Sequence, residues 1–209
     1  MNVGAGTGSY EPDRRLVAVE PSGVMLAQRQ AGAAPAVRAT AEHLPFADGA
    51  ADAALAVLTV HHWHDWWAGL GELMRVAPRQ VIVTFDPEVS ANQWVIRDYV
   101  PEIAGLDSGR VPYAAMVEAL GAEVAVLPVS RGFPDGVLGA FWCRPEAYLD
   151  PVVRSRMSGF AQVDPAAVER GMARLADDLR SGAWARRNAE LHGLEAYDAG
   201  FRLLVAGAG

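Results

Sequence analysis

The residues best suited to chemistry stand at the start of the chain, in the run Val3-Gly4-Ala5-Gly6-Thr7-Gly8. Closely spaced glycines permit positive φ and let the backbone approach a ligand without interference from a Cβ atom. Glu20 follows twelve residues after Gly8, where its carboxylate can accept hydrogen bonds from both hydroxyls of a ribose. The nicotinamide fingerprint is different, because it reads G-x-G-x-x-G with the acid about 20 residues on. The pattern therefore favours a nucleoside ligand without a diphosphate.

A second group of candidates, His61-His62-Trp63-His64-Asp65, follows the apolar run 52–60. An imidazole here could act as a general base, since its unperturbed pKa is about 6.5. Helix capping or filling space beside the ligand are the alternatives for His61 and His62. Three histidines within four residues also raise the question of a metal. However, His61 and His62 are adjacent, and His62 and His64 would need extended backbone to share an ion. We therefore predict no metal site.

These groups must be positioned by the elements around them, and the apolar pattern predicts alternating strands and helices. Strands are expected at residues 16–19, 37–40, 52–60, 80–85, 123–129 and 201–206. Helices are expected at residues 23–30, 64–76, 113–120, 146–157, 165–180 and 184–192. Near-continuous apolar strands alternating with helices indicate an α/β, Rossmann-like fold, with a mostly parallel sheet and helices on both faces.

Four segments, in order, resemble class I S-adenosylmethionine-dependent methyltransferases: VGAGTG, AVEPS, ATAEHLPFADGAAD and LTVHHWHDW. The subgroup is the small-molecule type with an A-E-x-L-P-F signature, and the likeness is strong from Val3 to about Pro87. It implies S-adenosylmethionine as cofactor, with the glycine loop on its methionine and ribose part and Glu20 on the ribose hydroxyls. Pro21 would pack beside the adenine, Ala41 and Glu42 would face its edge, and Thr40 would take the place of a common Asp. The implied cofactor-binding set is Gly4, Ala5, Gly6, Gly8, Glu20, Pro21, Thr40, Ala41 and Glu42.

The resemblance also implies how the 209 residues are divided into structural parts. We expect one methyltransferase-like domain over 1–209, with a cofactor-binding core at 1–130, a helical cap inserted at 131–200 and an antiparallel last strand at 201–209. The amino-terminal strand is expected to be truncated, with only Met1-Asn2-Val3 before the glycine loop, and only Ser9 to Arg15 separate that loop from the next strand. The first crossover is therefore expected to be a turn or a stub of helix.

Aromatic and arginine side chains supply candidates for binding the substrate. Trp63, Trp66 and Trp67 could form an aromatic wall for a sulfonium, or part of them could be core of the following helix. A further set could bind an anionic or aromatic small molecule, or equally be core residues and surface pairs. Its members are Trp94, Arg97, Tyr99, Arg110, Tyr113, Phe141, Trp142, Arg144 and Tyr148.

Composition limits the partners. The net charge of −7 argues against a general grip on nucleic acid or an anionic membrane, and the single cysteine fits a reducing, cytoplasmic setting. The leading hypothesis is methyl transfer to a small-molecule acceptor by in-line displacement, with His61 and His62 as catalytic candidates. A degenerate binding module is the first alternative. A nicotinamide oxidoreductase is disfavoured by the glycine spacing and by the lack of any lysine. The oligomeric state stays open.

Overall fold

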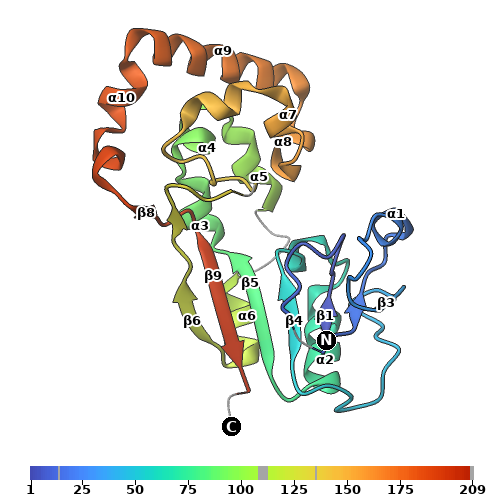
Figure 1. Cartoon of the computed structure of the whole chain (residues 1–209). Coiled ribbons are helices and arrows are strands. Elements are labelled where there is room, and N and C mark those ends of the chain that lie inside the picture. Colours follow the sequence, from blue (N-terminus) through green and yellow to red (C-terminus); the bar gives the residue numbers. More distant parts are fainter. Residues whose placement is uncertain (14, 108–112, 135, 208–209) are drawn as a thin grey trace. The chain divides into compact units, whose positions relative to one another are not determined.

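The computed structural model describes residues 1–13, 15–107, 113–134 and 136–207. The chain forms two compact units. The sheet unit comprises Met1–Phe85, Val111–Ala125 and Arg202–Gly209, and the helical unit comprises Asp86–Arg110 and Val126–Phe201 (Figure 1). The helical unit thus takes in residues 86–110 as well as the region after 130 where the insertion is expected. The division of the chain into domains remains a prediction.

The sheet unit is built on seven strands in the order β3-β2-β1-β4-β5-β9-β6. Parallel pairs join β3 to β2, β2 to β1, β1 to β4 and β4 to β5, and the last strand, β9, runs opposite to its neighbours (Figure 1). This confirms the mostly parallel sheet with an antiparallel last strand. The bounds are β1 Asn2–Val3, β2 Ala18–Val19, β3 Ala36–Val37, β4 Ala54–Val57, β5 Gln80–Phe85, β6 Glu123–Val126 and β9 Phe201–Ala206.

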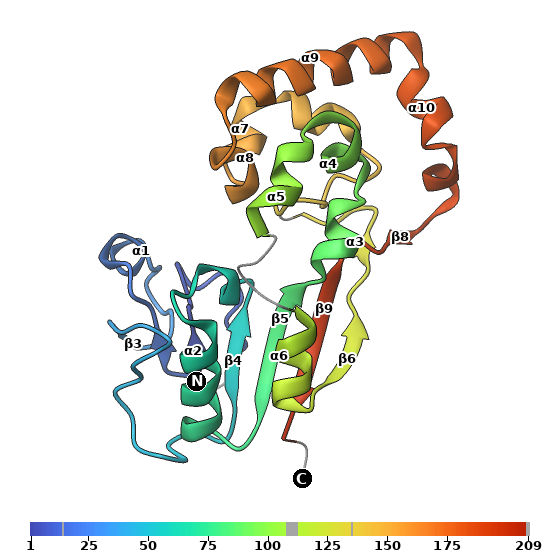
Figure 2. The ribbon, with the colours of Figure 1, turned by 180° about the vertical axis from the view of Figure 1, so that it is seen from behind.

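Four helical segments accompany this sheet: α1 Gly23–Ala27, the 3-10 turn η1 Val60–His62, α2 Trp66–Val76 and α6 Tyr113–Leu120. Both α2 and α6 lie on the same face of the sheet, behind it in Figure 1 and in front of it in Figure 2. Leu70 and Leu73 of α2 and Met116 of α6 pack there against Val3 and Ile82 of the strands. The burial pattern of β5 alternates between buried and half-buried residues accordingly.

Helices α2 and α6 lie on one face of the sheet, whereas the described part of the first crossover contributes no helix. Residues 4–17 link the parallel strands β1 and β2, and the described ones among them form turns and no helix. The glycine loop takes up residues 4–8, and the part that follows is shorter than the dozen or more residues that a crossover with a helix usually takes. The expectation of a turn at this place is confirmed.

The helical unit begins directly after β5. Asp86 accepts hydrogen bonds from the amides of Glu88 and Val89 and starts a helix at Pro87. The longest helix, α9, matches its prediction, since Asp164 caps its start and Gly182, with φ of +70°, ends it. The bounds are α3 Pro87–Ala91, α4 Trp94–Tyr99, η2 Pro101–Ile103, α5 Ala104–Asp107, β7 Val129–Ser130, η3 Pro145–Leu149, α7 Pro151–Arg154, α8 Ser158–Ala161, α9 Pro165–Ser181, α10 Ala183–Arg187, η4 Ala189–Gly193 and β8 Ala196–Tyr197.

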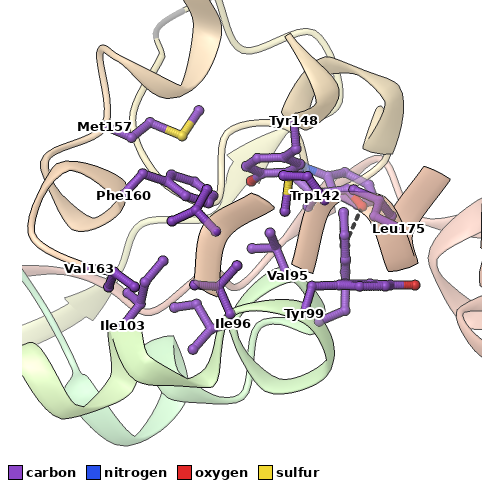
Figure 3. Packing of buried hydrophobic residues seen from close by; sticks show 14 of the residues in the cluster. Val95, Ile96, Tyr99, Ile103, Trp142, Tyr148, Met157, Phe160, Val163 and Leu175 are labelled. Atoms are coloured by element: carbon purple, nitrogen blue, oxygen red, sulfur yellow. Dashed lines mark hydrogen bonds between the residues drawn. The ribbon is translucent and has the colours of Figure 1, made fainter. Parts of the chain in front are cut away.

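Aromatic side chains fill the core of the helical unit (Figure 3). The Trp94 ring meets those of Tyr99, Tyr148 and Trp184 edge to face, with centroids 5.2–5.9 Å apart. The Trp94 indole donates to the Trp142 carbonyl at 2.9 Å, so its buried polar atom is satisfied. Of the suggested substrate-binding set, Trp94, Tyr99, Trp142 and Tyr148 are therefore core residues.

The other members of that set also have structural partners. Arg97 pairs with Asp98 at 2.7 Å, and Arg144 donates to the Phe133 carbonyl at 2.8 Å. Phe141 lies against the same unit's core and Tyr113 against that of the sheet unit, whereas Arg110 lies outside the described residues.

One polar network ties α4 to the last two helices of the helical unit. Asp178 accepts hydrogen bonds from the Tyr99 hydroxyl and the Arg187 guanidinium, both at 2.8 Å. The Arg187 hydrogen bond, followed by that of Tyr99, lowers the pKa of Asp178. Burial, with the neighbouring Asp178 carboxylate, raises the pKa of Tyr99 to about 12. The network therefore holds its charges over the whole neutral range.

We expect Asp178→Asn to lower the free energy of unfolding by about 1 kcal/mol at pH 7, because the Tyr99 bond becomes a neutral one and the Arg187 guanidinium loses its opposite charge. Since folding lowers the pKa of Asp178, this contribution is present above the pKa of the unfolded chain and is lost as the pH falls through the folded value. Urea titrations at pH 7 and pH 3 measure it. Asp177→Asn, in an exposed pair on the same helix, is the control with little effect. A difference as large at pH 3 as at pH 7 would contradict the assignment.

Trp63 and α2 yield a second prediction, because the Trp63 ring packs on Gly69. A Cβ at Gly69 would lie 2.4 Å from that ring, whereas a Cβ at Gly71 has no heavy atom within 4 Å. Gly71→Ala should therefore raise the free energy of unfolding by roughly 0.5–1 kcal/mol through helix propensity. Gly69→Ala should lower it by roughly 1–3 kcal/mol, because the indole must move. Thermal unfolding and tryptophan fluorescence report both changes, and equal shifts for the two variants would refute the packing argument.

Candidate functional site

The glycine loop joins β1 to the turn before β2, and its three glycines all have positive φ: +73° at Gly4, +55° at Gly6 and +94° at Gly8. The amides of Gly4 and Ala5 both donate to the Val19 carbonyl, at 2.8 and 3.0 Å. A Cβ at Gly4 would lie 1.9 Å from the Thr59 hydroxyl, so only glycine fits there. At Gly6 the nearest heavy atom to such a Cβ is 3.7 Å away. The loop is therefore packed at Gly4 and open at Gly6.

Glu20, at the end of β2, holds this loop. Its side chain is almost fully buried, with the residue 5% exposed. One carboxylate oxygen accepts the Gly6 amide and the other the Ser22 amide, each at 2.8 Å. A carboxylate has about four acceptor positions, so each oxygen keeps one for a further donor. The loop and the acid that the sequence picked out thus lie in direct contact.

A second buried charged pair reaches the same loop, and the sequence analysis missed it. Arg29 donates to Glu11 at 2.5 Å and to the Gly6 carbonyl at 3.4 Å. The two side chains are only 7% and 10% exposed. The pair is separated by eighteen residues without a periodic pattern, so only the charges themselves gave a signal.

Glu42, in the segment after β3, is hydrogen-bonded to the residues that precede α2. Burial alone would raise the pKa of Glu42, but hydrogen bonds from backbone amides and the Thr40 hydroxyl outweigh it and lower this pKa. One Glu42 oxygen accepts the amides of His64 and Asp65 at 2.8 and 3.2 Å, so Glu42 anchors the start of α2. Ala41 is 5% exposed and belongs to the core of the sheet unit.

Pro21 and Thr40 are both exposed in the sheet unit. The Pro21 carbonyl accepts a hydrogen bond from Arg38 at 3.1 Å. Neither residue is enclosed by the protein, so both remain open to a ligand.

The carboxyl end of β4 carries the catalytic candidates. Leu58 has φ of +50°, which an L-amino acid with a large side chain rarely adopts. His61 and His62 follow in η1, with ring centroids 3.9 Å apart. The His61 ring is half-buried, 5.2 Å from that of Phe85 at the end of β5, and His62 is exposed. The imidazoles thus stand where parallel strands end, which is where open α/β sheets bind ligands.

The tryptophans beside them do not form one wall. Trp66 packs against the core of the sheet unit, whereas Trp67 is 60% exposed. Trp63 lies on Gly69 of α2. In the part of the chain that the structure describes, no group of three or more His, Cys, Asp or Glu side chains could hold a metal ion.

Together these features fit a nucleoside cofactor with no diphosphate. Gly6 leaves room at the loop, and Glu20 presents buried acceptors that suit vicinal hydroxyls. The exposed Met25 side chain, 3.7 Å from a Cβ position at Gly6, adds an apolar surface beside them. S-Adenosylmethionine has this combination, because a sulfonium joins its ribose and flat base to methionine without a diphosphate.

Comparison with known proteins agrees with this geometry. Residues 1–84 match the family model described as a methyltransferase domain. Among curated protein sequences, none matches this chain. No helix within the described ranges is long and apolar enough to cross a membrane.

Three solved structures share the fold. A protein of Anabaena variabilis, named as a candidate methyltransferase from an antibiotic biosynthesis pathway, is 29% identical, with 98% of this chain and 88% of that chain covered and a TM-score of 0.90. A candidate type II methyltransferase of Anaeromyxobacter dehalogenans is 21% identical, with 98% and 86% covered and a TM-score of 0.51. The [4+2]-cyclase SpnF is 16% identical, with 98% and 72% covered and a TM-score of 0.52. The last two show the fold alone.

The family match of residues 1–84 and the close structural match over nearly the whole chain together support a class I S-adenosylmethionine-dependent methyltransferase.

Proposed function

We propose that this methyltransferase transfers a methyl group to a small-molecule acceptor by in-line displacement. The observation that carries the proposal is the contact between the Gly6 amide and the buried Glu20 carboxylate, which presets a cradle for a nucleoside. The small-molecule acceptor is supported by the relative named for an antibiotic biosynthesis pathway. The net charge of −7 opposes a nucleic-acid acceptor. The single cysteine supports a cytoplasmic setting.

The cofactor in this proposal is held from two sides. The open backbone at Gly6, with Gly8 following it in the same loop, approaches its methionine and ribose part, and Gly4 and Ala5 fix the loop by their bonds to the Val19 carbonyl. Glu20 accepts the ribose hydroxyls with its remaining lone pairs. The adenine is assigned to the surface formed by Pro21, Thr40, Ala41 and Glu42.

S-Adenosylmethionine, when bound, supplies a methyl group activated on a sulfonium. The protein's part is then to align an acceptor, exclude water and remove a proton. His61 is the better placed of the two imidazoles, because it is half-buried beside Phe85 whereas His62 is exposed. We assign it the role of general base, with His62 as the alternative.

Glu20→Ala should weaken binding of S-adenosylmethionine and of its demethylated product by about 1–3 kcal/mol, or roughly 5- to 150-fold, because charge-assisted hydrogen bonds are lost. Calorimetric titration measures this, with a urea titration to confirm that the variant is folded. Glu169→Gln removes an exposed acid from α9 and should bind as the wild type does. Unchanged affinity in Glu20→Ala would remove Glu20 from the site, and a wild type that binds NAD but neither sulfur nucleoside would refute the proposal.

Substitution of His61 by Gln should lower kcat by about 10²–10⁴-fold while leaving the cofactor Kd within about twofold, since general bases contribute to the chemical step. The wild-type rate should also fall at acid pH, as the imidazole takes up a proton, and this fall should vanish in the variant. The same substitution at His62 is the matched control. If it alone reduces kcat, the base is His62, and if neither does, proton removal by this segment is excluded.

A further inference from the structure

The loop that must hold the cofactor lacks the support of a crossover helix. Between β1 and β2 the described residues form turns, and they border a cleft of about 1090 Å³ against the connection from α1 to β3. Glu11 lines this cleft, together with residues 7–9, 12–13, 15–17, 28 and 30–35. A glycine-rich loop beside an open cleft can adopt many conformations, so other contacts must hold it in one of them.

The buried pair of Glu11 and Arg29 supplies that support through four hydrogen bonds. Arg29 donates to Glu11 at 2.5 Å, to the Ala34 carbonyl at 3.0 Å and to the Gly6 carbonyl at 3.4 Å. The other Glu11 oxygen accepts the Ala34 amide at 3.1 Å. The pair therefore connects both sides of the cleft, the glycine loop on one and the segment before β3 on the other.

The consequence is clearest at Gly6. Its amide donates to Glu20 and its carbonyl accepts from Arg29, so two buried charged side chains hold the two polar groups of one glycine. Gly8 is also enclosed, because a Cβ there would lie 3.3 Å from the Arg29 guanidinium and 3.4 Å from the Glu11 carboxylate. Rotation of the loop about Gly6 would break its bond to Glu20 or its bond to Arg29.

We propose that Arg29 and Glu11 are positioning residues for cofactor binding: they preset the glycine loop in the conformation that receives S-adenosylmethionine. This inference rests on the proposed function. It predicts a cost in affinity rather than in fold, because a loop that must be ordered on binding reduces the affinity by the fraction of time it spends in the competent conformation.

A double variant distinguishes a pair that only stabilises the fold from a pair that also positions the glycine loop. Replacing a buried ion pair by two apolar side chains is often neutral or stabilising, whereas removing one partner leaves a buried charge unpaired. Arg29→Met should therefore lower the stability, and Glu11→Leu with Arg29→Met should recover it. Affinity should not recover, since Met cannot donate to the Gly6 carbonyl.

The experiment is calorimetric titration of the full chain with S-adenosylmethionine and its demethylated product, beside a urea titration of each variant. The double variant should raise both Kd values at least tenfold while its unfolding midpoint stays near that of the wild type. Arg180→Met, which breaks an exposed ion pair on α9, is the control for loss of one arginine and should leave Kd within about twofold.

Wild-type affinity in the double variant would overturn the inference, because loop position would then not depend on the pair. Should Arg29→Met fail to fold, the double variant alone decides. A wild type that binds neither sulfur nucleoside would instead refute the proposed function, so the two failures are distinguishable.

Discussion

One buried carboxylate, that of Glu20, fixes the geometry on which the site depends. The strands β1 and β2 pair over two residues each, which is too short a ladder to orient the loop that follows. Glu20 compensates by accepting one amide from the loop and one from the turn before α1. Buried amides without a partner are costly, so both segments are drawn to this one side chain. The cofactor loop is therefore held by hydrogen bonds to a side chain more than by regular secondary structure.

The two partners of this contact, the glycine loop and Glu20, could be picked out from the sequence because their signals are local. Glycines at alternate positions, followed by an acid after the next apolar segment, indicate a ligand-binding loop even when the fold is unknown. The bonds of Arg29 to Glu11 and of Glu42 to the start of α2 are different. Each joins residues about twenty apart, and any of the many charges in the chain could have paired with any other. Only the folded backbone selects these partners.

The same distinction explains the fold. Strand β5, helix α6 and strand β9 match their predicted bounds, because each has a long apolar pattern of one period. The helices between Pro87 and Asp107 were not foreseen, since each has six residues or fewer and a helical period needs more to be visible. Aromatic residues such as Trp94 and Tyr148 were ambiguous for another reason. A buried aromatic core and an aromatic binding surface have the same composition, and burial alone tells them apart.

A strained residue just after the neighbouring strand β4 precedes the segment that carries the candidate base. Among the described residues, Leu58 is the one non-glycine with positive φ, and it precedes Thr59, which packs into the space that a Cβ at Gly4 would need. Such a conformation costs of order 1–3 kcal/mol and persists only where the surroundings enforce it. Here the packing of Thr59 against Gly4 is the contact that holds Leu58 in this conformation. The chain then enters the turn η1, which carries His61. The end of β4 and the cofactor loop therefore constrain each other, so a change that loosens Gly4 must also disturb the segment that carries the candidate base.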